Sequence, residues 1–173
     1  MSTSVAKKMP YSIEAEQAVL GCVLINDNAC SVIMGSLKAN AFYSKAHKTI
    51  FECMQRIYEK NQPVDYVTVI SELEKENSLN DIGGIDYITT LTNAVPTAAN
   101  FEHYADIVKR DFVLRELINA GQKIIEMSYE SDDMNLALKY AEKQIFDIGE
   151  NEAFSELEQI GSAMKQVLDK IKK

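Results

Sequence analysis

The stretch from Asn100 to Tyr129 constrains the fold most, because its thirty residues contain no proline and a single glycine. Such a stretch predicts one helix of roughly 45 Å at 1.5 Å per residue. Its apolar residues form two lines at helical spacing: Ile107, Leu114, Ile118 and Ile125 on one, and Ala105, Phe112, Leu117 and Ile124 on the other. A helix with apolar residues on more than one face needs more than one neighbour to bury them.

The segment that follows predicts a second helix, which returns along the first. The polar turn ESDD, residues 130–133, ends the long helix, and Asp132 or Asp133 is the expected cap of the next one. The returning helix carries apolar residues at alternating spacings of four and three: Met134, Leu138, Ala141, Ile145 and Ile148. This narrow seam is typical of a coiled-coil contact. Residues 99–150 are therefore expected to form an antiparallel helical hairpin.

The hairpin has more apolar surface than its own seam can cover. Since an uncovered apolar face favours a second copy as its partner, we expect self-association. The residues that carry this prediction are Ile107, Leu114, Leu138 and Ile145. The sequence leaves the number of subunits open, from a dimer to a hexamer.

Residues 13–98 predict a small helical bundle that forms a head for the hairpin. Helices are expected at residues 13–25, about 29–37, 45–60, 67–77 and 85–95. Ser12 and Ser44 are the expected caps of the first and third helices, and the Gly83-Gly84 turn opens the fifth. Residues 1–12 are expected to be a short flexible arm. The predicted fold class is all-α.

The last nineteen residues, SELEQIGSAMKQVLDKIKK, predict a separate amphipathic helix. Ser155 and Glu158 form a capping box at its start, and residues 149–153 before it are expected to be a linker. We therefore assign residues 151–173 to a linker and a linker helix. Its apolar side chains form one line: Leu157, Ile160, Met164, Leu168 and Ile171. A lone helix of this length is marginal in water, so the line is expected to dock, either on its own domain or on another module or subunit.

The composition argues against a nucleic-acid-binding surface. A net charge of −8 is poorly suited to gripping a phosphate backbone, which needs clustered Lys and Arg. The cysteines, Cys22, Cys30 and Cys53, lack metal-ligand spacing and are expected to be reduced and buried, as in a cytoplasmic protein. No apolar run is long enough to span a bilayer, so no membrane partner is expected.

No motif in the sequence predicts catalysis. A P-loop requires a Gly-Lys pair, which the sequence lacks, so Gly83-Gly84 is interpreted as a helix-initiating turn. His47 and His103 lie on predicted helices and match no metal-ligand spacing. No nucleophile has a base at recognisable spacing. We expect a binding or assembly module without catalytic residues, metal or cofactor. A stand-alone helical enzyme is the less favoured alternative.

Three runs of residues lie in order along the chain: PYSIEAEQAVLGCVL, AFYSKAHKTIFECMQRIYEKNQPVDYVTV and IGGIDYITTLTNAVPTAANFEHYADIVKRDFVLRELI. Together they resemble the N-terminal region of the bacterial replicative DNA helicases, the DnaB family. The resemblance covers about Pro10 to Ile118, and the weaker run AEKQIFDI fits the second arm of the hairpin.

The resemblance implies a collar. In that family, six copies of this region form a trimer of dimers on a ring of RecA-like ATPase domains. A linker helix packs on the ATPase domain of the neighbouring subunit, and the 155–173 helix resembles it. The Walker motif and the DNA-contacting loops are absent from this sequence, so we interpret the chain as a truncated part of a helicase. ATP and magnesium are implied only for the absent ATPase domain, and DNA contact only for the parent helicase.

The resemblance also implies a protein partner, the C-terminal domain of primase. The matching contact positions are Glu14, Tyr87, Ile118 and Ile124. Other roles stay open for each of them. Both isoleucines would serve equally in the hairpin seam or in a contact between subunits. Tyr87 would also suit core packing, and Glu14 would favour the helix N-terminus electrostatically.

A second family-level alternative is the helicase-binding C-terminal region of a primase, whose helical fold is similar. The motifs EAEQ…LG and IGG…Y favour the helicase.

Overall fold

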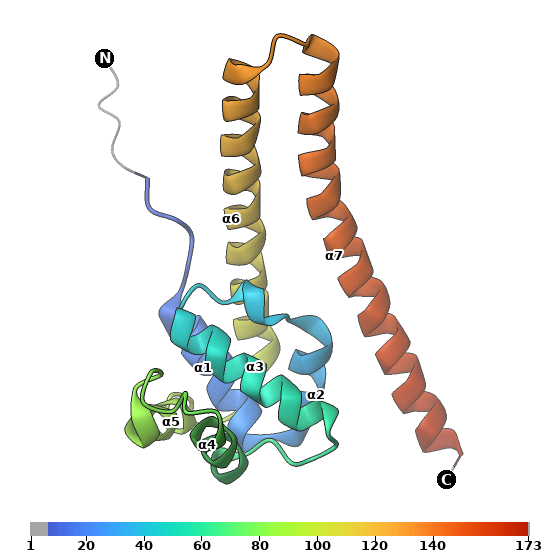
Figure 1. Ribbon diagram of the computed structural model, residues 1–173. Helices are drawn as coiled ribbons and strands as arrows, with labels where there is room; N and C mark the ends of the chain where they lie inside the picture. Colours follow the sequence, from blue (N-terminus) through green and yellow to red (C-terminus); the bar gives the residue numbers. More distant parts are fainter. Residues whose placement is uncertain (1–6, 173) are drawn as a thin grey trace.

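The computed structural model describes residues 7–172, which are helical along most of their length (Figure 1). The elements are α1 (Ile13–Ile25), α2 (Asp27–Ser36), the 3-10 helix η1 (Ala39–Ala41), α3 (Lys45–Glu59), α4 (Tyr66–Lys75), α5 (Gly84–Thr92), α6 (Phe101–Glu130) and α7 (Met134–Ile171). No strand occurs between residues 7 and 172. The all-α prediction is confirmed.

The head is built around α1, which contacts α2, α3, α5 and α6. Because neighbours surround it, α1 is apolar on nearly all sides, and Val19, Leu20 and Cys22 are fully buried. The predicted caps are confirmed: Ser12 accepts a hydrogen bond from the Ala15 amide, and Ser44 accepts one from the His47 amide. The cysteines are free and buried, as expected.

Glycine at position 21 sets the spacing between α1 and α5. A Cβ atom on Gly21 would lie 2.4 Å from the carbonyl oxygen of Leu91 in α5. Real Cβ contacts do not come this close, so any larger residue requires the two helix backbones to separate. The close approach brings the polar first turn of α1 within reach of α5.

The Gly83-Gly84 pair starts α5, which confirms its interpretation as a helix-initiating turn. Gly83 has φ +105° and is the N-cap residue. This left-handed conformation is one that L residues rarely adopt. A Cβ on Gly83 would also lie 3.0 Å from the Cβ of Tyr87, so this turn packs directly beneath that side chain.

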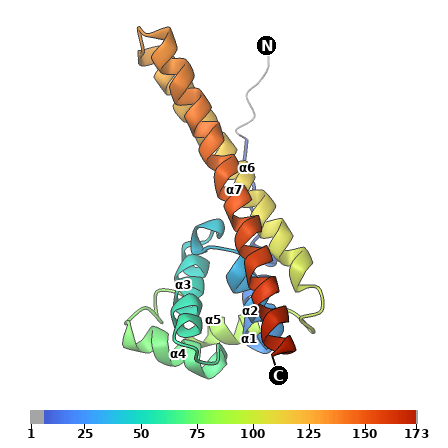
Figure 2. The same ribbon diagram turned by 90° about the vertical axis from the view of Figure 1, so that its right-hand side faces the viewer.

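The hairpin formed by α6 and α7 projects from the head (Figures 1 and 2). The first turns of α6 belong to the head, where Phe101, Ala105 and Val108 are buried in the core. Beyond them α6 runs beside α7 in the antiparallel sense. Asp133 caps α7 by accepting hydrogen bonds from the amides of Asn135 and Leu136.

The predicted seam of the hairpin is only partly correct. Ala141 and Ile148 are half-buried, but Met134, Leu138 and Ile145 are exposed. The half-buried positions of this arm include small and polar residues: Ala137, Tyr140, Ala141, Gln144 and Ile148. The apolar spacing identified one side of α7 correctly as apolar, but the neighbouring side, with its small alanines, approaches α6.

The predicted linker at residues 149–153 is wrong, because α7 continues through it without a break. A glycine inside a helix costs only about 1 kcal/mol relative to alanine, and no proline accompanies Gly149. An ion pair between Lys109 and Glu152, at 3.1 Å, ties this part of α7 to α6. The side chains of Ser155 and Glu158, the predicted capping box, lie outside the described residues.

The last part of α7 passes back along the head beside α2 (Figures 1 and 2). Gln166 Nε2 donates a hydrogen bond of 3.1 Å to Ser31 Oγ. Ser162 Oγ lies 4.0 Å from the Cβ position of Gly35. Of the two expected docking modes, the helix itself therefore lies on its own domain.

Candidate functional site

The terminal part of α7 uses its polar side for the contact with α2 and leaves its apolar line exposed. Residues two apart in a helix lie on nearly opposite sides, so Ser162 and Gln166 face α2 while the line points away. Its members are 53–72% exposed: Leu157, Ile160, Met164, Leu168 and Ile171. Because this part of α7 contacts α2 through its polar side, its apolar line is available to a partner.

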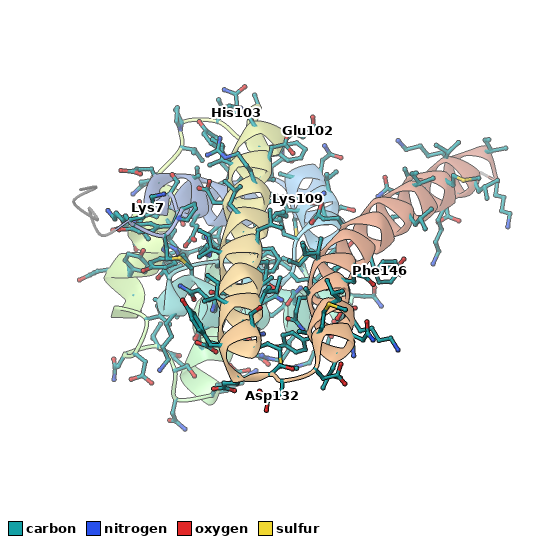
Figure 3. The ribbon with its side chains drawn as sticks, turned by 90° about the horizontal axis from the view of Figure 1, so that it is seen from above. Lys7, Glu102, His103, Lys109, Asp132 and Phe146 are labelled. Carbon is teal, nitrogen blue, oxygen red and sulfur yellow. The ribbon has the colours of Figure 1, made fainter. Side chains whose placement is uncertain are left out.

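The hairpin carries a second exposed apolar surface. Leu114, Leu138 and Ile145 are 41–56% exposed, whereas Ile107 is partly buried against the head core. Further exposed apolar side chains of the hairpin are Leu117, Ile118, Ile125, Tyr129, Met134, Leu136 and Phe146. Figure 3 shows Phe146 on the side of α7 that faces away from α6. Contiguous exposed apolar side chains commonly mark a protein interaction site.

One part of the space between α6 and α7, next to residues 116–126 of α6, is lined mainly by polar residues. A cavity of about 490 Å³ lies between the two helices. Its lining includes Glu116, Lys123, Gln144 and Asp147. A polar seam buries little apolar surface and so contributes little hydrophobic stabilisation. Covering the exposed apolar side chains of the hairpin with a partner would bury more.

The four positions matched to a primase contact do not share one environment. Glu14 is exposed in the first turn of α1, and Ile118 is 37% exposed on α6. Ile124 is half-buried one turn beyond the buried Ala120, where α7 runs beside α6. Tyr87 is half-buried, and its ring packs against the head core.

A buried carboxylate organises the part of the head nearest to Tyr87. Glu16, in α1, is only 2% exposed. Its oxygens accept hydrogen bonds from the main-chain amides of Tyr43 and Ser44, at 2.5 and 3.3 Å. The third partner is His47 Nδ1 in α3, at 2.5 Å. One side chain thus satisfies three donors, of which the imidazole of His47 is fully buried.

The chain of hydrogen bonds continues from His47 to α5. The other ring nitrogen, Nε2, lies 2.6 Å from the hydroxyl oxygen of Tyr87. Gln17 Nε2 donates to the same hydroxyl at 3.3 Å. The Glu–His–Tyr order is that of a proton relay, but His47 is fully buried and both of its ring nitrogens are engaged, so a substrate cannot reach the imidazole. The chain ties α1, α3 and α5 together.

Arg115 joins this region to the root of the hairpin. Its guanidinium donates to the carbonyl oxygens of Pro10 and Ala41, at 2.8 and 2.7 Å. It also lies over the ring of Tyr43, 5.5 Å from the centroid. Burial lowers the pKa of Arg115, while Glu16 acts in the opposite direction. Five donors in a rigid fork make arginine suited to holding several carbonyl groups at once.

The described part of the N-terminal arm, residues 7–12, contacts the head through Pro10 and Tyr11. The rings of Tyr11 and Tyr43 stack with centroids 4.2 Å apart, and Lys8 Nζ lies 4.7 Å from the Tyr11 centroid. The expectation of a flexible arm is therefore wrong for Pro10 and Tyr11, which contact the head, and residues 1–6 lie outside the described part. Aromatic stacking and the bond from Arg115 to Pro10 supply the contacts that the sequence did not reveal.

Sequence reasoning missed Glu16, His47, Tyr43 and Arg115 as a connected group. One signal was present: Glu16 sits in a helix whose later positions are almost all apolar, which is typical of a buried polar residue with partners. The described side chains contain no group of three or more His, Cys, Asp or Glu placed to hold a metal ion. Within residues 7–172, no helix combines the length and apolarity needed to cross a membrane.

Comparison with known proteins places the chain in a family. The family described as the DnaB-like helicase N terminal domain matches residues 8–110. The chain is 37% identical over 163 residues to the replicative DNA helicase DnaC of Bacillus subtilis (strain 168), and 39% identical over 163 residues to the replicative DNA helicase DnaB of Geobacillus stearothermophilus. Each alignment covers 94% of this chain but 36% of the relative, so the chain spans just over a third of these helicases.

Solved structures agree with the sequence comparison. The crystal structure of the N-terminal domain of DnaB helicase from Mycobacterium tuberculosis matches with a TM-score of 0.76 and 35% identity, covering 81% of this chain and 99% of that one. A DnaB-like replicative helicase, solved in a study of its interactions with primase, matches with a TM-score of 0.67 and 27% identity, over 79% of this chain and 31% of that one. The chain belongs to the DnaB-like helicase N-terminal domain family.

Proposed function

We propose that this chain is the collar region of a replicative hexameric DNA helicase, and that it mediates self-association, primase docking and attachment to an ATPase ring. The observation that carries the proposal is the excess of exposed apolar side chains on the hairpin and on the end of α7. In a member of this family, these surfaces match the contacts that a collar has to make. Unwinding, with its ATP and magnesium, belongs to the parent helicase, which acts on DNA in the cytoplasm.

The apolar line at the end of α7 is the proposed docking surface for the ATPase domain of a neighbouring subunit. Two features support this role. The line is exposed, although the helix that bears it already contacts α2. The described side chains in the contact with α2 include the small and polar groups of Ser31, Ser162 and Gln166, and the apolar line stays exposed to an additional partner.

The hairpin surface is proposed to serve both self-association and primase docking. Leu138 and Ile145 lie on the outer side of α7, and Ile118 lies on α6. One structural relative, a DnaB-like replicative helicase solved in a study of its interactions with primase, supports primase as the partner. Family membership also favours the helicase over the alternative of a primase C-terminal region, since the matched relatives are helicases.

Replacing Ile118 with aspartate is expected to weaken binding of the C-terminal domain of the cognate primase by about tenfold or more, because a charge would then be desolvated at an apolar contact. Isothermal titration calorimetry of the wild-type chain and the variant measures the effect. The matched control is Val67→Asp, an equally drastic change at an exposed residue of α4 on the head. A wild-type chain that is folded but releases no heat with the primase domain would remove primase docking from the proposal.

Replacing Leu138 and Ile145 together with aspartate is expected to shift the chain toward the monomer. Each substitution places a charge on the apolar side of α7, and burying it at an interface would cost several kcal/mol. Sedimentation velocity over a range of concentrations follows the change. The double variant Val67→Asp, Ile85→Asp, which alters two exposed apolar residues of the head, is expected to sediment as the wild type does. Self-association through the hairpin is ruled out if the wild type is monomeric at the highest concentration.

A further inference from the structure

We propose that His47 is a positioning residue for the primase surface: it holds the hydroxyl of Tyr87 and so fixes the first turns of α5 in the orientation that the partner binds. This inference rests on the proposed primase docking, and it assigns a role to a side chain that the partner itself cannot touch. His47 is fully buried and lies between Glu16 and Tyr87.

The direction of each hydrogen bond in this chain follows from the groups at its start. The carboxylate of Glu16 already accepts from two main-chain amides, so it also acts as the acceptor toward His47 Nδ1. With the proton on Nδ1, the neutral imidazole presents Nε2 as an acceptor. In this neutral tautomer the hydroxyl of Tyr87 donates to Nε2, and its oxygen accepts from Gln17.

These two hydrogen bonds fix the hydroxyl end of Tyr87, whose side chain is half-buried against the head core. The hydroxyl proton is committed to His47, so it is not available to a partner. The Cβ atom of Tyr87 lies 3.0 Å from the position that a Cβ atom on Gly83 would occupy. Tyr87 is thus fixed at both ends. The partner therefore meets Tyr87 in a position that is set from within the head.

The same network reaches the second part of the proposed primase surface. The amide of Tyr43 donates to Glu16, and the ring of Tyr43 lies under the guanidinium of Arg115. Arg115 is in α6, one helical turn before Ile118. A single connected set of contacts, with Glu16, His47 and Arg115 buried in it, therefore sets both Tyr87 on the head and the start of the exposed surface on the hairpin.

Two substitutions at position 47 separate the two hydrogen bonds of the imidazole. The amide of asparagine occupies the place of Nδ1, so His47→Asn keeps the bond to Glu16 and loses the bond to Tyr87. The longer glutamine reaches the place of Nε2, so His47→Gln keeps an acceptor for Tyr87 and loses the bond to Glu16. Each variant loses one buried hydrogen bond, so both are expected to lose similar folding stability.

Calorimetric titration with the C-terminal domain of the cognate primase tests the inference. We expect the dissociation constant of His47→Asn to rise by about five- to tenfold, and that of His47→Gln to stay within about twofold of the wild type. Urea denaturation of both variants accompanies the titration, because a purely structural role would make the loss of binding follow the loss of stability. Tyr87→Phe, which lacks the hydroxyl, is expected to behave as His47→Asn does. It replaces that variant if His47→Asn fails to fold.

A double-mutant cycle completes the design. In the background of Tyr87→Phe, His47→Asn is expected to cause no additional loss of binding, because the bond is already absent. Equal dissociation constants for the asparagine and glutamine variants, with a wild type that binds and an Ile118→Asp variant that binds more weakly, would overturn the positioning role and leave primase docking intact. A folded wild type that fails to bind the primase domain would overturn both.

Discussion

Replacing Glu16 with alanine is expected to lower the free energy of unfolding by about 3–5 kcal/mol, because it removes the shared acceptor of three donors. The largest part of the loss is expected at the Nδ1 group of His47, which is fully buried, while the amides of Tyr43 and Ser44 are only partly buried. Urea denaturation followed by circular dichroism measures the change.

Two further variants show whether the loss comes from the hydrogen bonds. Glu16→Gln keeps the shape and one acceptor oxygen, so its expected loss is smaller, about 1–2 kcal/mol. Glu14→Ala, in the same turn of α1 but exposed, removes only a favourable interaction with the helix dipole and should cost less than about 1 kcal/mol. If Glu16→Ala and Glu14→Ala lose the same stability, the buried network does not stabilise the head.

Replacing Gly21 with alanine is expected to destabilise the protein by about 2 kcal/mol, although alanine is the better helix former. The new Cβ would lie 2.4 Å from the carbonyl oxygen of Leu91, and the atom it meets is main chain that cannot rotate away. Overpacking of this kind costs typically about 1–3 kcal/mol, occasionally more. It outweighs the gain of about 1 kcal/mol from helix propensity.

The matched control for Gly21→Ala is a second glycine-to-alanine substitution, which is expected to raise the stability of the protein. Gly121 lies inside α6 with open space around its Cβ position, so Gly121→Ala is expected to stabilise the protein by up to about 1 kcal/mol. Thermal and urea denaturation of the two variants provide the comparison. Equal stabilisation by both substitutions would show that α1 and α5 separate freely and that their close approach is not required.

Local signals in the sequence were sufficient to predict most of the head and the existence of the hairpin. Ser12 and Ser44 cap their helices through their own side chains, so the evidence for each start lies within a few residues. The run from Asn100 to Tyr129 without a breaker likewise predicted α6 to within about one residue at each end.

Features that depend on contacts between distant segments could not be predicted in the same way. The polar residues after Gly149 led to the prediction of a linker, because an exposed helix surface and a loop have similar compositions. The segment is part of α7. The sequence around His47 indicates only a helix residue. Its partners, Glu16 in α1 and Tyr87 in α5, are distant in the sequence and become evident only in the folded structure. Arg115 holds the carbonyl oxygen of Pro10, which is 105 positions earlier in the chain.

The uninterrupted course of α7 has a mechanical consequence. Its 38 residues form a rod of roughly 57 Å at 1.5 Å per residue, and long helices bend only gently unless a specific break is present. The hairpin tip and the exposed terminal line thus belong to one stiff lever that rests on α2 and α6. We therefore expect a partner bound at the terminal end of α7 to transmit force along the helix toward the tip of the hairpin, because no break in the helix lies between the two surfaces.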